Sequence, residues 1–194
     1  VVGVSEPRCR CTSVVLVPWP TSPPCGLWGP HFCSQRGATP FPGRPVLPLI
    51  SNNVVYSPRL TRFYRTGEAF PLALLDDARD RLSVHYRPEL GEDFTSAGLC
   101  LYRDGNDSVA WHGDTIGRGA TTDTMVAILS LGAARPLCLR PRGGGRTAYR
   151  IPLGHGDLAV MGGSCQRTWE HAIPKTAKQV GARISVQFRP RGVA

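Results

Sequence analysis

The alternation of apolar and polar residues predicts one helix followed by a series of short strands. Residues 67–86 carry four apolar side chains near one face, Leu72, Leu75, Ala78 and Leu82. That spacing is typical of an amphipathic helix. Seven short apolar segments follow, separated by glycine, proline and aspartate, at 97–103, 124–131, 136–141, 147–152, 157–162, 165–172 and 182–189. Segments of this length are typical of strands, so we expect a mainly β (α+β) barrel or sandwich with a flanking helix.

The first 50 or so residues differ from the rest of the chain in composition. Residues 1 to about 50 hold 10 of the 18 prolines and four of the seven cysteines, and VPWPTSPPCGLWGPHFC follows neither the helical nor the strand period. Dense proline interrupts both helices and strands, so we predict an irregular, poorly ordered leader over 1–53 and a folded domain over 54–194. The segment SVVLVPWP lacks the charged start and the cleavage site of a signal peptide.

Charge narrows the class of partner. The formal net charge is +9, and only Lys175 and Lys178 among the 23 basic residues are lysines. A positive field rich in arginine favours acidic partners, nucleic acid first, although an arginine-rich genome composition accounts for the same excess. No apolar run is long enough to predict a membrane span, and the cysteines show no disulfide spacing, so we expect a cytoplasmic monomer with no membrane contact.

The tripeptide His-Gly-Asp occurs twice, at 112–114 and at 155–157. Residues i and i+2 of a strand point the same way, about 7 Å apart, so His112 and Asp114 can bind one metal ion. His171, near the start of another predicted strand, can supply a third ligand. Two histidines and one carboxylate form the ligand set of non-haem Fe(II) oxygenases, which leaves positions open for a co-substrate and O2.

The second copy has no distal histidine of its own. We expect Asp157 to shape a turn by accepting hydrogen bonds from nearby backbone N–H groups. Further along the chain, Arg183 and Arg189 in RISVQFR share one face of a predicted strand. An oxygenase that uses a dicarboxylate needs a buried cation for the far carboxylate, and arginine binds a carboxylate bidentately. The position of this strand shortly after His171 favours that role over a solvated strand end.

These segments resemble a known family. LYRDGNDSVAWHGD, AILSLGAARPLCLR, HGDLAVMGG, TWEHAIPK and RISVQFR are similar to the AlkB family of 2-oxoglutarate- and Fe(II)-dependent dioxygenases, over residues from about 58 to 191. The resemblance implies a double-stranded β-helix (jelly-roll) domain that uses Fe(II), 2-oxoglutarate and O2. It also implies oxidative demethylation of N-alkylated bases in DNA or RNA, with release of formaldehyde and succinate.

The resemblance assigns roles to individual residues. It implies that Fe(II) is bound by His112, Asp114 and His171. It implies co-substrate contacts from Tyr102, Arg183, Ser185 and Arg189, with Arg183 on the far carboxylate and Arg189 beside the metal-proximal carboxylate and Asp114. We also expect a basic rim for the phosphates of alkylated DNA or RNA, formed by Arg103, Arg118, Arg140, Arg142 and Arg146.

Three positions depart from the family pattern. Cys100 stands where the family often has asparagine, and Ser185 stands where some members have it. Ile116 replaces an acidic residue that in some members meets the exocyclic amine of the damaged base. Two alternatives therefore remain: the same oxygenase chemistry on a protein or a small molecule, and a catalytically inert, basic nucleic-acid-binding barrel. The complete ligand set together with Arg183 argues against the inert barrel.

Overall fold

The computed structural model of the chain describes residues 14–17 and 58–193. They belong to one compact unit, Val1–Trp19 with Pro58–Ala194. Most of the expected leader over 1–53, its cysteines included, lies outside the described residues. The part of it that is described, Val14–Val17, forms strand β1.

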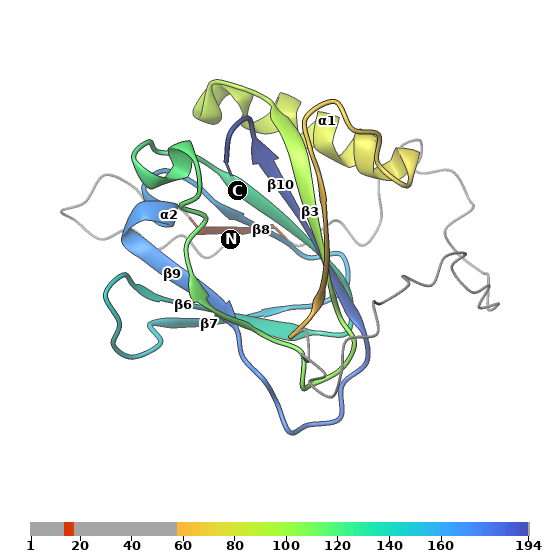
Figure 1. Cartoon of the computed structure of the whole chain (residues 1–194), viewed down its shortest axis with the longest axis vertical. Helices are drawn as coiled ribbons and strands as arrows, with labels where there is room; N and C mark the ends of the chain where they lie inside the picture. Colours follow the sequence, from red (N-terminus) through yellow and green to blue (C-terminus); the bar gives the residue numbers. More distant parts are fainter. Residues whose placement is uncertain (1–13, 18–57, 194) are drawn as a thin grey trace, which may run out of the picture. The chain divides into compact units, whose positions relative to one another are not determined.

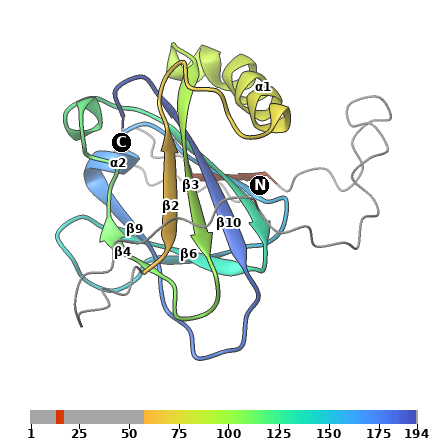
Figure 2. The same cartoon turned by 45° about the vertical axis from the view of Figure 1, so that its right-hand side comes forward.

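Two antiparallel sheets make up the described domain (Figure 1). The large sheet has the order β1-β8-β5-β10-β3-β2, with β8 at Leu158–Met161, β5 at Val126–Gly132, β10 at Arg183–Pro190, β3 at Phe94–Tyr102 and β2 at Leu60–Tyr64. The small sheet has the order β4-β9-β6-β7, with β4 at Val109–His112, β9 at Trp169–Ile173, β6 at Arg135–Pro141 and β7 at Tyr149–Leu153. Figure 2 shows β2, β3 and β10 side by side. This is the double-stranded β-helix that the resemblance implies.

Helix α1 (Ala73–Leu90) confirms the predicted helix, displaced toward the carboxyl end. It buries Leu75, Ala78 and Leu82 as the spacing predicts. Leu72 differs: it precedes the first turn and is 62% exposed, so it does not belong to the buried face. The helix ends at Gly91, whose φ of 81° lies in the left-handed region that glycine adopts without strain.

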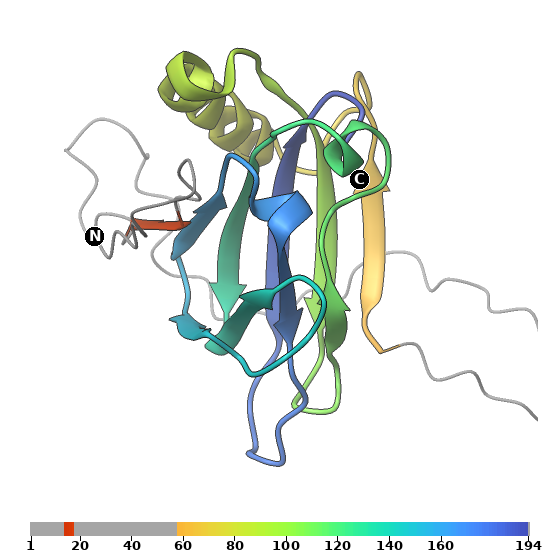
Figure 3. The same ribbon diagram turned by 90° about the vertical axis from the view of Figure 1, so that its left-hand side faces the viewer.

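Successive side chains of the large sheet point to opposite faces and belong to two separate hydrophobic clusters. On β5, Ala127 packs with the buried face of α1, whereas Val126 and Ile128 belong to a second cluster that includes Leu137 of the small sheet. This alternation is the two-residue period of a strand. One face of the large sheet, whose strands Figure 3 shows side by side, is therefore covered by α1, and the other faces the small sheet (Figure 1). The second interface holds the pocket described below.

The strand predictions are confirmed with four differences. The predicted segment 165–172 divides into a short helix α2 (Cys165–Thr168) and β9. Three strands were not predicted: β1, β2 and β4. The prediction of an irregular leader was wrong at Val14–Val17, where β1 pairs with β8. The side chains of β2 are mostly exposed and the residues of β4 are only partly buried, so neither shows the run of buried apolar residues that marks a central strand. Among the described residues, no helix combines the length and the apolar character needed to cross a membrane.

Candidate metal and co-substrate site

A cavity of about 200 Å³ lies between the two sheets. The small sheet and the segment after β4 contribute His112, Asp114 and His171, and one face of β10 contributes Arg183, Ser185, Gln187 and Arg189. A wider hollow of about 350 Å³ lies beside α1, but its charged side chains are neutralised locally in the ion pairs Arg79–Asp80 and Arg87–Asp93. The cavity between the sheets is therefore the candidate site.

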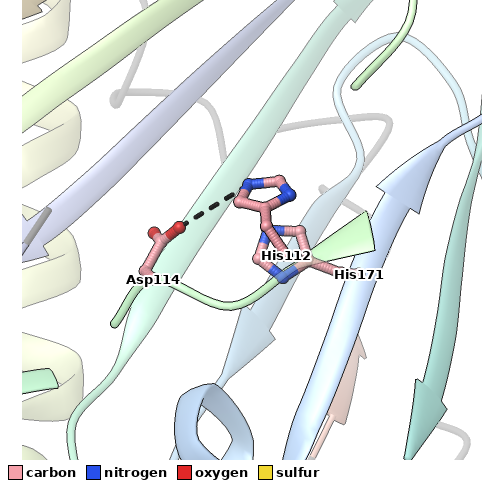
Figure 4. Close-up of side chains that lie close together, drawn as sticks. All are labelled: His112, Asp114 and His171. Carbon is pink, nitrogen blue, oxygen red and sulfur yellow. Dashed lines mark ion pairs between the residues drawn. The ribbon is translucent and has the colours of Figure 1, made fainter. Parts of the chain in front are cut away.

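The three candidate ligands converge in this cavity (Figure 4). One ligand atom from each of His112, Asp114 and His171 lies within 4.8 Å of the other two. Strand pairing brings them together, because His112 of β4 is directly opposite His171 of β9. The two imidazole centroids are 4.2 Å apart, and His112 Nε2 is 3.8 Å from Asp114 Oδ1. The predicted triad can therefore hold one metal ion.

Backbone contacts prepare His112 to bind through a defined nitrogen. Its Nδ1 lies 2.8 Å from the carbonyl oxygen of Ala110. A carbonyl oxygen only accepts, so Nδ1 carries the proton and donates, and the lone pair of Nε2 is left for a metal. A hydrogen bond of this kind fixes both the tautomer and the orientation of a ligating imidazole.

Asp114 is fixed from two sides. Arg189 Nε donates to its Oδ2 at 2.7 Å, which leaves Oδ1 turned toward His112. Its backbone N–H donates to Oε1 of the buried Gln166 at 2.9 Å. Burial alone would raise the pKa of Asp114, but Arg189 and the two imidazoles outweigh it and hold that pKa below its usual range. The carboxyl group is therefore ionised, as a metal ligand must be.

His171 is buried in the fold, and burial together with the neighbouring His112 lowers its pKa to about 3, against the opposing effect of Asp114. An unfolded histidine titrates near 6.5. Between these values the unfolded chain binds more protons, so the unfolding free energy of the metal-free protein should fall as the pH drops from about 6.5 toward about 3. Protonation of Asp114 lowers the unfolding free energy further, but only below about pH 3.9, the ordinary pKa of an aspartate. Thermal melts across this range should show the slope, and His171→Asn should flatten it; an unchanged slope would refute the assignment.

The two His-Gly-Asp copies use glycine for different reasons. In the first copy, a Cβ on Gly113 would lie 2.4 Å from the carbonyl oxygen of Gln166 and 2.7 Å from Arg142 Nη2, so the backbone of α2 and an arginine pack directly against it. In the second copy, Gly156 has a φ of 83° in a turn. There Asp157 Oδ2 accepts from the N–H of Gly154 at 2.7 Å, which confirms the predicted turn contact.

Gly113→Ala should therefore weaken metal binding, because the added methyl group would collide with the backbone carbonyl of Gln166 and must shift the segment that carries His112 and Asp114. We expect a loss of about tenfold or more in affinity, the scale seen when groups that orient metal ligands are disturbed. Titration with Mn(II), followed by the electron paramagnetic resonance of the free ion, measures it. Gly154→Ala is the matched control, since its Cβ would meet only Asp157 Oδ2 at 3.5 Å. Equal affinities of the two variants would show that the contact is irrelevant.

The end of the pocket away from the three metal ligands can bind an anion. Arg183 is 1% exposed, its Nε donates to Ser130 Oγ at 2.9 Å, and its Nη1 and Nη2 are buried with no hydrogen-bond partner among the described residues. Tyr102 lies beside it, with the guanidinium carbon 5.4 Å from the ring centroid. Burial raises the pKa of Tyr102 to about 12, so its phenol remains a hydrogen-bond donor. Donors without acceptors fit the far carboxylate of a dicarboxylate.

Most of the arginines predicted as a phosphate rim have protein partners. Arg103 pairs with the buried Asp107, Arg118 with Glu92, and Arg140 with Glu170. Arg142 Nη2 donates to the carbonyl oxygen of Gln166 at 2.9 Å, and Arg146 is exposed. The phosphate contacts stay a prediction, and Arg142 is the member of this set placed beside the segment that joins His112 to Asp114.

Three residues of the site were not identified from the sequence. Arg59 lines the pocket from a segment that precedes β2, where no recognised motif exists. Gln166 fixes Asp114 from α2, inside a segment predicted as a strand. Gln187 was detectable, because it shares its strand face with Arg183 and Arg189 and the two-residue period of RISVQFR places it between them.

Known proteins resemble the chain over the same region. Residues 56–189 match the model of the 2OG-Fe(II) oxygenase superfamily. The chain is 34% identical to "Alpha-ketoglutarate-dependent dioxygenase alkB homolog 3" of Bos taurus and 36% identical to its Homo sapiens counterpart, in each case over 175 residues that cover 74% of this chain and 57% of the relative. It is 29% identical over 195 residues to "DNA oxidative demethylase ALKBH2" of Arabidopsis thaliana, covering 89% of this chain and 58% of that protein.

The chain thus spans little more than half the length of these curated relatives. Among solved structures, the chain matches a Pseudomonas putida prolyl-4-hydroxylase with a TM-score of 0.46 and 18% identity, over 67% of this chain and 68% of that one. The matched segment 56–189 includes His112, Asp114, His171 and Arg183. The chain belongs to the 2OG-Fe(II) oxygenase superfamily and, with its curated relatives, to the AlkB family.

Proposed function

We propose that the domain over 54–194 is an Fe(II)- and 2-oxoglutarate-dependent dioxygenase that demethylates N-alkylated bases in nucleic acid. His112, Asp114 and His171 are its iron ligands. The observation that carries the proposal is the pairing, in one cavity, of this ligand set with the buried and unpaired terminal nitrogens of Arg183. A metal site alone fits many activities, whereas a metal site facing a buried donor pair fits a chelating dicarboxylate.

Bound iron, 2-oxoglutarate and O2 supply the oxidation, which hydroxylates an N-methyl group so that it leaves as formaldehyde. The protein orients these partners. Arg183 and Tyr102 hold the far carboxylate, and Arg189 fixes the carboxylate of Asp114. The apolar residues Ile128, Leu137 and Ile173, with Val109, line the remainder of the cavity and exclude water from it.

Charge and kinship support nucleic acid as the substrate. The chain carries a formal net charge of +9, which attracts a polyanion. The Arabidopsis thaliana relative is named a DNA oxidative demethylase. We place the phosphate contacts on the arginine rim. Arg142 and Arg146 are its members in the loop between β6 and β7, where both are exposed. A base within a duplex must leave the stack to reach a buried metal, so single-stranded substrate should react more readily.

A methylated oligonucleotide tests this proposal. With Fe(II), 2-oxoglutarate and O2, the chain should release formaldehyde and succinate in equal amounts from an N-methylated oligonucleotide. It should release no formaldehyde from the same sequence without the methyl group. Turnover of 2-oxoglutarate without formaldehyde on any methylated base would contradict the substrate while leaving the oxygenase chemistry intact.

One observation favours a second substrate class. Ile116, two residues after Asp114, is 73% exposed, and some family members carry there an acid that contacts the base. An exposed isoleucine offers no hydrogen bond to an exocyclic amine. The same oxidation of a protein or small-molecule substrate is therefore the alternative, and formaldehyde-free succinate production in the assay above is its expected sign.

A further inference from the structure

Gln187 occupies the middle of the pocket wall between the two arginines of β10. Arg183, Ser185, Gln187 and Arg189 alternate along β10 and line the same cavity. Arg189 contacts Asp114, so its end of the strand is the metal end. Two residues of a strand advance about 7 Å, which places Gln187 one step from the metal end and two steps from Arg183.

The orientation of the Gln187 amide follows from chemistry. Arg189 Nη2 lies 2.7 Å from Gln187 Oε1. A guanidinium group only donates, so the amide oxygen must face Arg189 and the amide nitrogen must face the other way. Its partners there are Cys100 Sγ, a weak acceptor, at 3.5 Å, and Ser185 Oγ at 3.3 Å, which is long for an N–H···O hydrogen bond. The amide N–H groups can therefore turn to a stronger acceptor that enters the cavity.

The opposing strand makes room for this arrangement. Gln187 pairs in register with Gly98 of β3. A Cβ on Gly98 would lie 2.9 Å from Arg189 Nη1 and 3.4 Å from Gln187 Oε1. The glycine thus permits Gln187 and Arg189 to lie side by side against β3 without displacement.

We propose that Gln187 binds the metal-proximal carboxylate of the 2-oxo acid through its side-chain Nε2, while its Oε1 keeps Arg189 aligned on Asp114. The inference rests on the proposed function. It accounts for Cys100 and Ser185, which offer a thiol where the family often has asparagine and a hydroxyl where some members have it. The amide donor is supplied from two residues further along β10.

Two variants and a matched control test this role by binding rather than by turnover. Gln187→Glu keeps the size and the acceptor for Arg189 but replaces the donor with a negative charge, and Gln187→Met removes both functions. Gln179→Glu makes the same charge change in an exposed loop. Each protein is loaded anaerobically with Fe(II) and titrated with 2-oxoglutarate, and binding is measured from the visible charge-transfer band. Oxalate, which chelates the metal but has no far carboxylate, is then added, and its affinity is measured from the loss of that band as it displaces 2-oxoglutarate. Mn(II) affinity is measured without either acid.

Gln187→Glu and Gln187→Met should weaken 2-oxoglutarate binding by about tenfold to a hundredfold, the loss of a hydrogen bond to a charged group. Oxalate binding should weaken by a similar factor, because the contact is at the metal end. The Mn(II) affinity of Gln187→Glu, which keeps the acceptor for Arg189, and all affinities of Gln179→Glu should match wild type. Unchanged binding of 2-oxoglutarate in both Gln187 variants would overturn the inference. So would a parallel loss of Mn(II) affinity in Gln187→Glu, which would mean that Gln187 acts only through Arg189 and Asp114, or an effect confined to 2-oxoglutarate.

The outcome separates this inference from the proposed function. If wild-type protein binds Fe(II) and 2-oxoglutarate while the Gln187 variants bind them equally well, the oxygenase assignment stands and the role of Gln187 is wrong. If the wild-type protein gives no charge-transfer band, both are wrong.

Discussion

Replacing His112 by alanine should lower turnover by more than about 100-fold, since even the loss of a group that only orients a metal ligand costs 10- to 100-fold. The reason is local. Asp114 and His171 remain, but two protein ligands bind a divalent ion far more weakly than three. His112 is partly exposed, so its removal leaves no large cavity in a core. Succinate release and Mn(II) affinity should fall together, while salt-sensitive affinity for an oligonucleotide should remain.

The second His-Gly-Asp copy supplies the control. His155 occupies the equivalent position in that tripeptide, and its Nδ1 accepts from the backbone N–H of Gly132 at 3.1 Å. It is not part of the ligand group found among the described residues. His155→Ala should therefore retain turnover and Mn(II) affinity. If the two alanine variants lose activity to the same degree, the first copy has no special role and the metal assignment is wrong.

Replacing Arg183 by methionine should raise the dissociation constant of 2-oxoglutarate by about 30-fold to several thousandfold, the range for a buried charge partner worth 2–5 kcal/mol. Methionine keeps the apolar length of the side chain and removes the charge. Without co-substrate, the guanidinium is a buried cation with two terminal nitrogens unpaired among the described residues. The variant should therefore unfold no earlier than wild type, because removing an uncompensated charge relieves a desolvation cost.

A second ligand checks that this effect belongs to the far carboxylate. Oxalate chelates a metal but extends no second carboxylate toward Arg183, so its affinity should be the same in Arg183→Met and in wild type. Oligonucleotide affinity should also be unchanged. Loss of oxalate or oligonucleotide binding to the same extent as 2-oxoglutarate would contradict the assigned role and indicate a general collapse of the pocket.

The spacing of the chemistry-bearing residues allowed much of the site to be predicted. Arg183 and Arg189 share one face of β10 by the two-residue period of a strand, which is local geometry that the sequence carries directly. His112 and Asp114 do converge, but β4 ends at His112, so Asp114 lies in the segment after the strand and not on its face. The register of β4 with β9, which brings His171 opposite His112, is a contact between distant segments.

Other features depend on contacts between distant segments, which no local pattern records. Gln166 reaches Asp114 across 52 positions of the chain, and Gly113 is required by the backbone of α2 rather than by its own conformation. Strand β2 has an exposed pattern because it lies at the edge of the large sheet. Leu72 fits the helical period but precedes the first turn and is exposed, so the prediction that it lies on the apolar face was wrong.

Crystals soaked anaerobically with Fe(II) and 2-oxoglutarate would test the central claim most directly, with the iron located by its anomalous scattering. The account predicts one iron per chain, bonded to Nε2 of His112, to Oδ1 of Asp114 and to a ring nitrogen of His171. It also predicts one carboxylate of 2-oxoglutarate on Arg183. An iron bound elsewhere, or bound without His171, would contradict it.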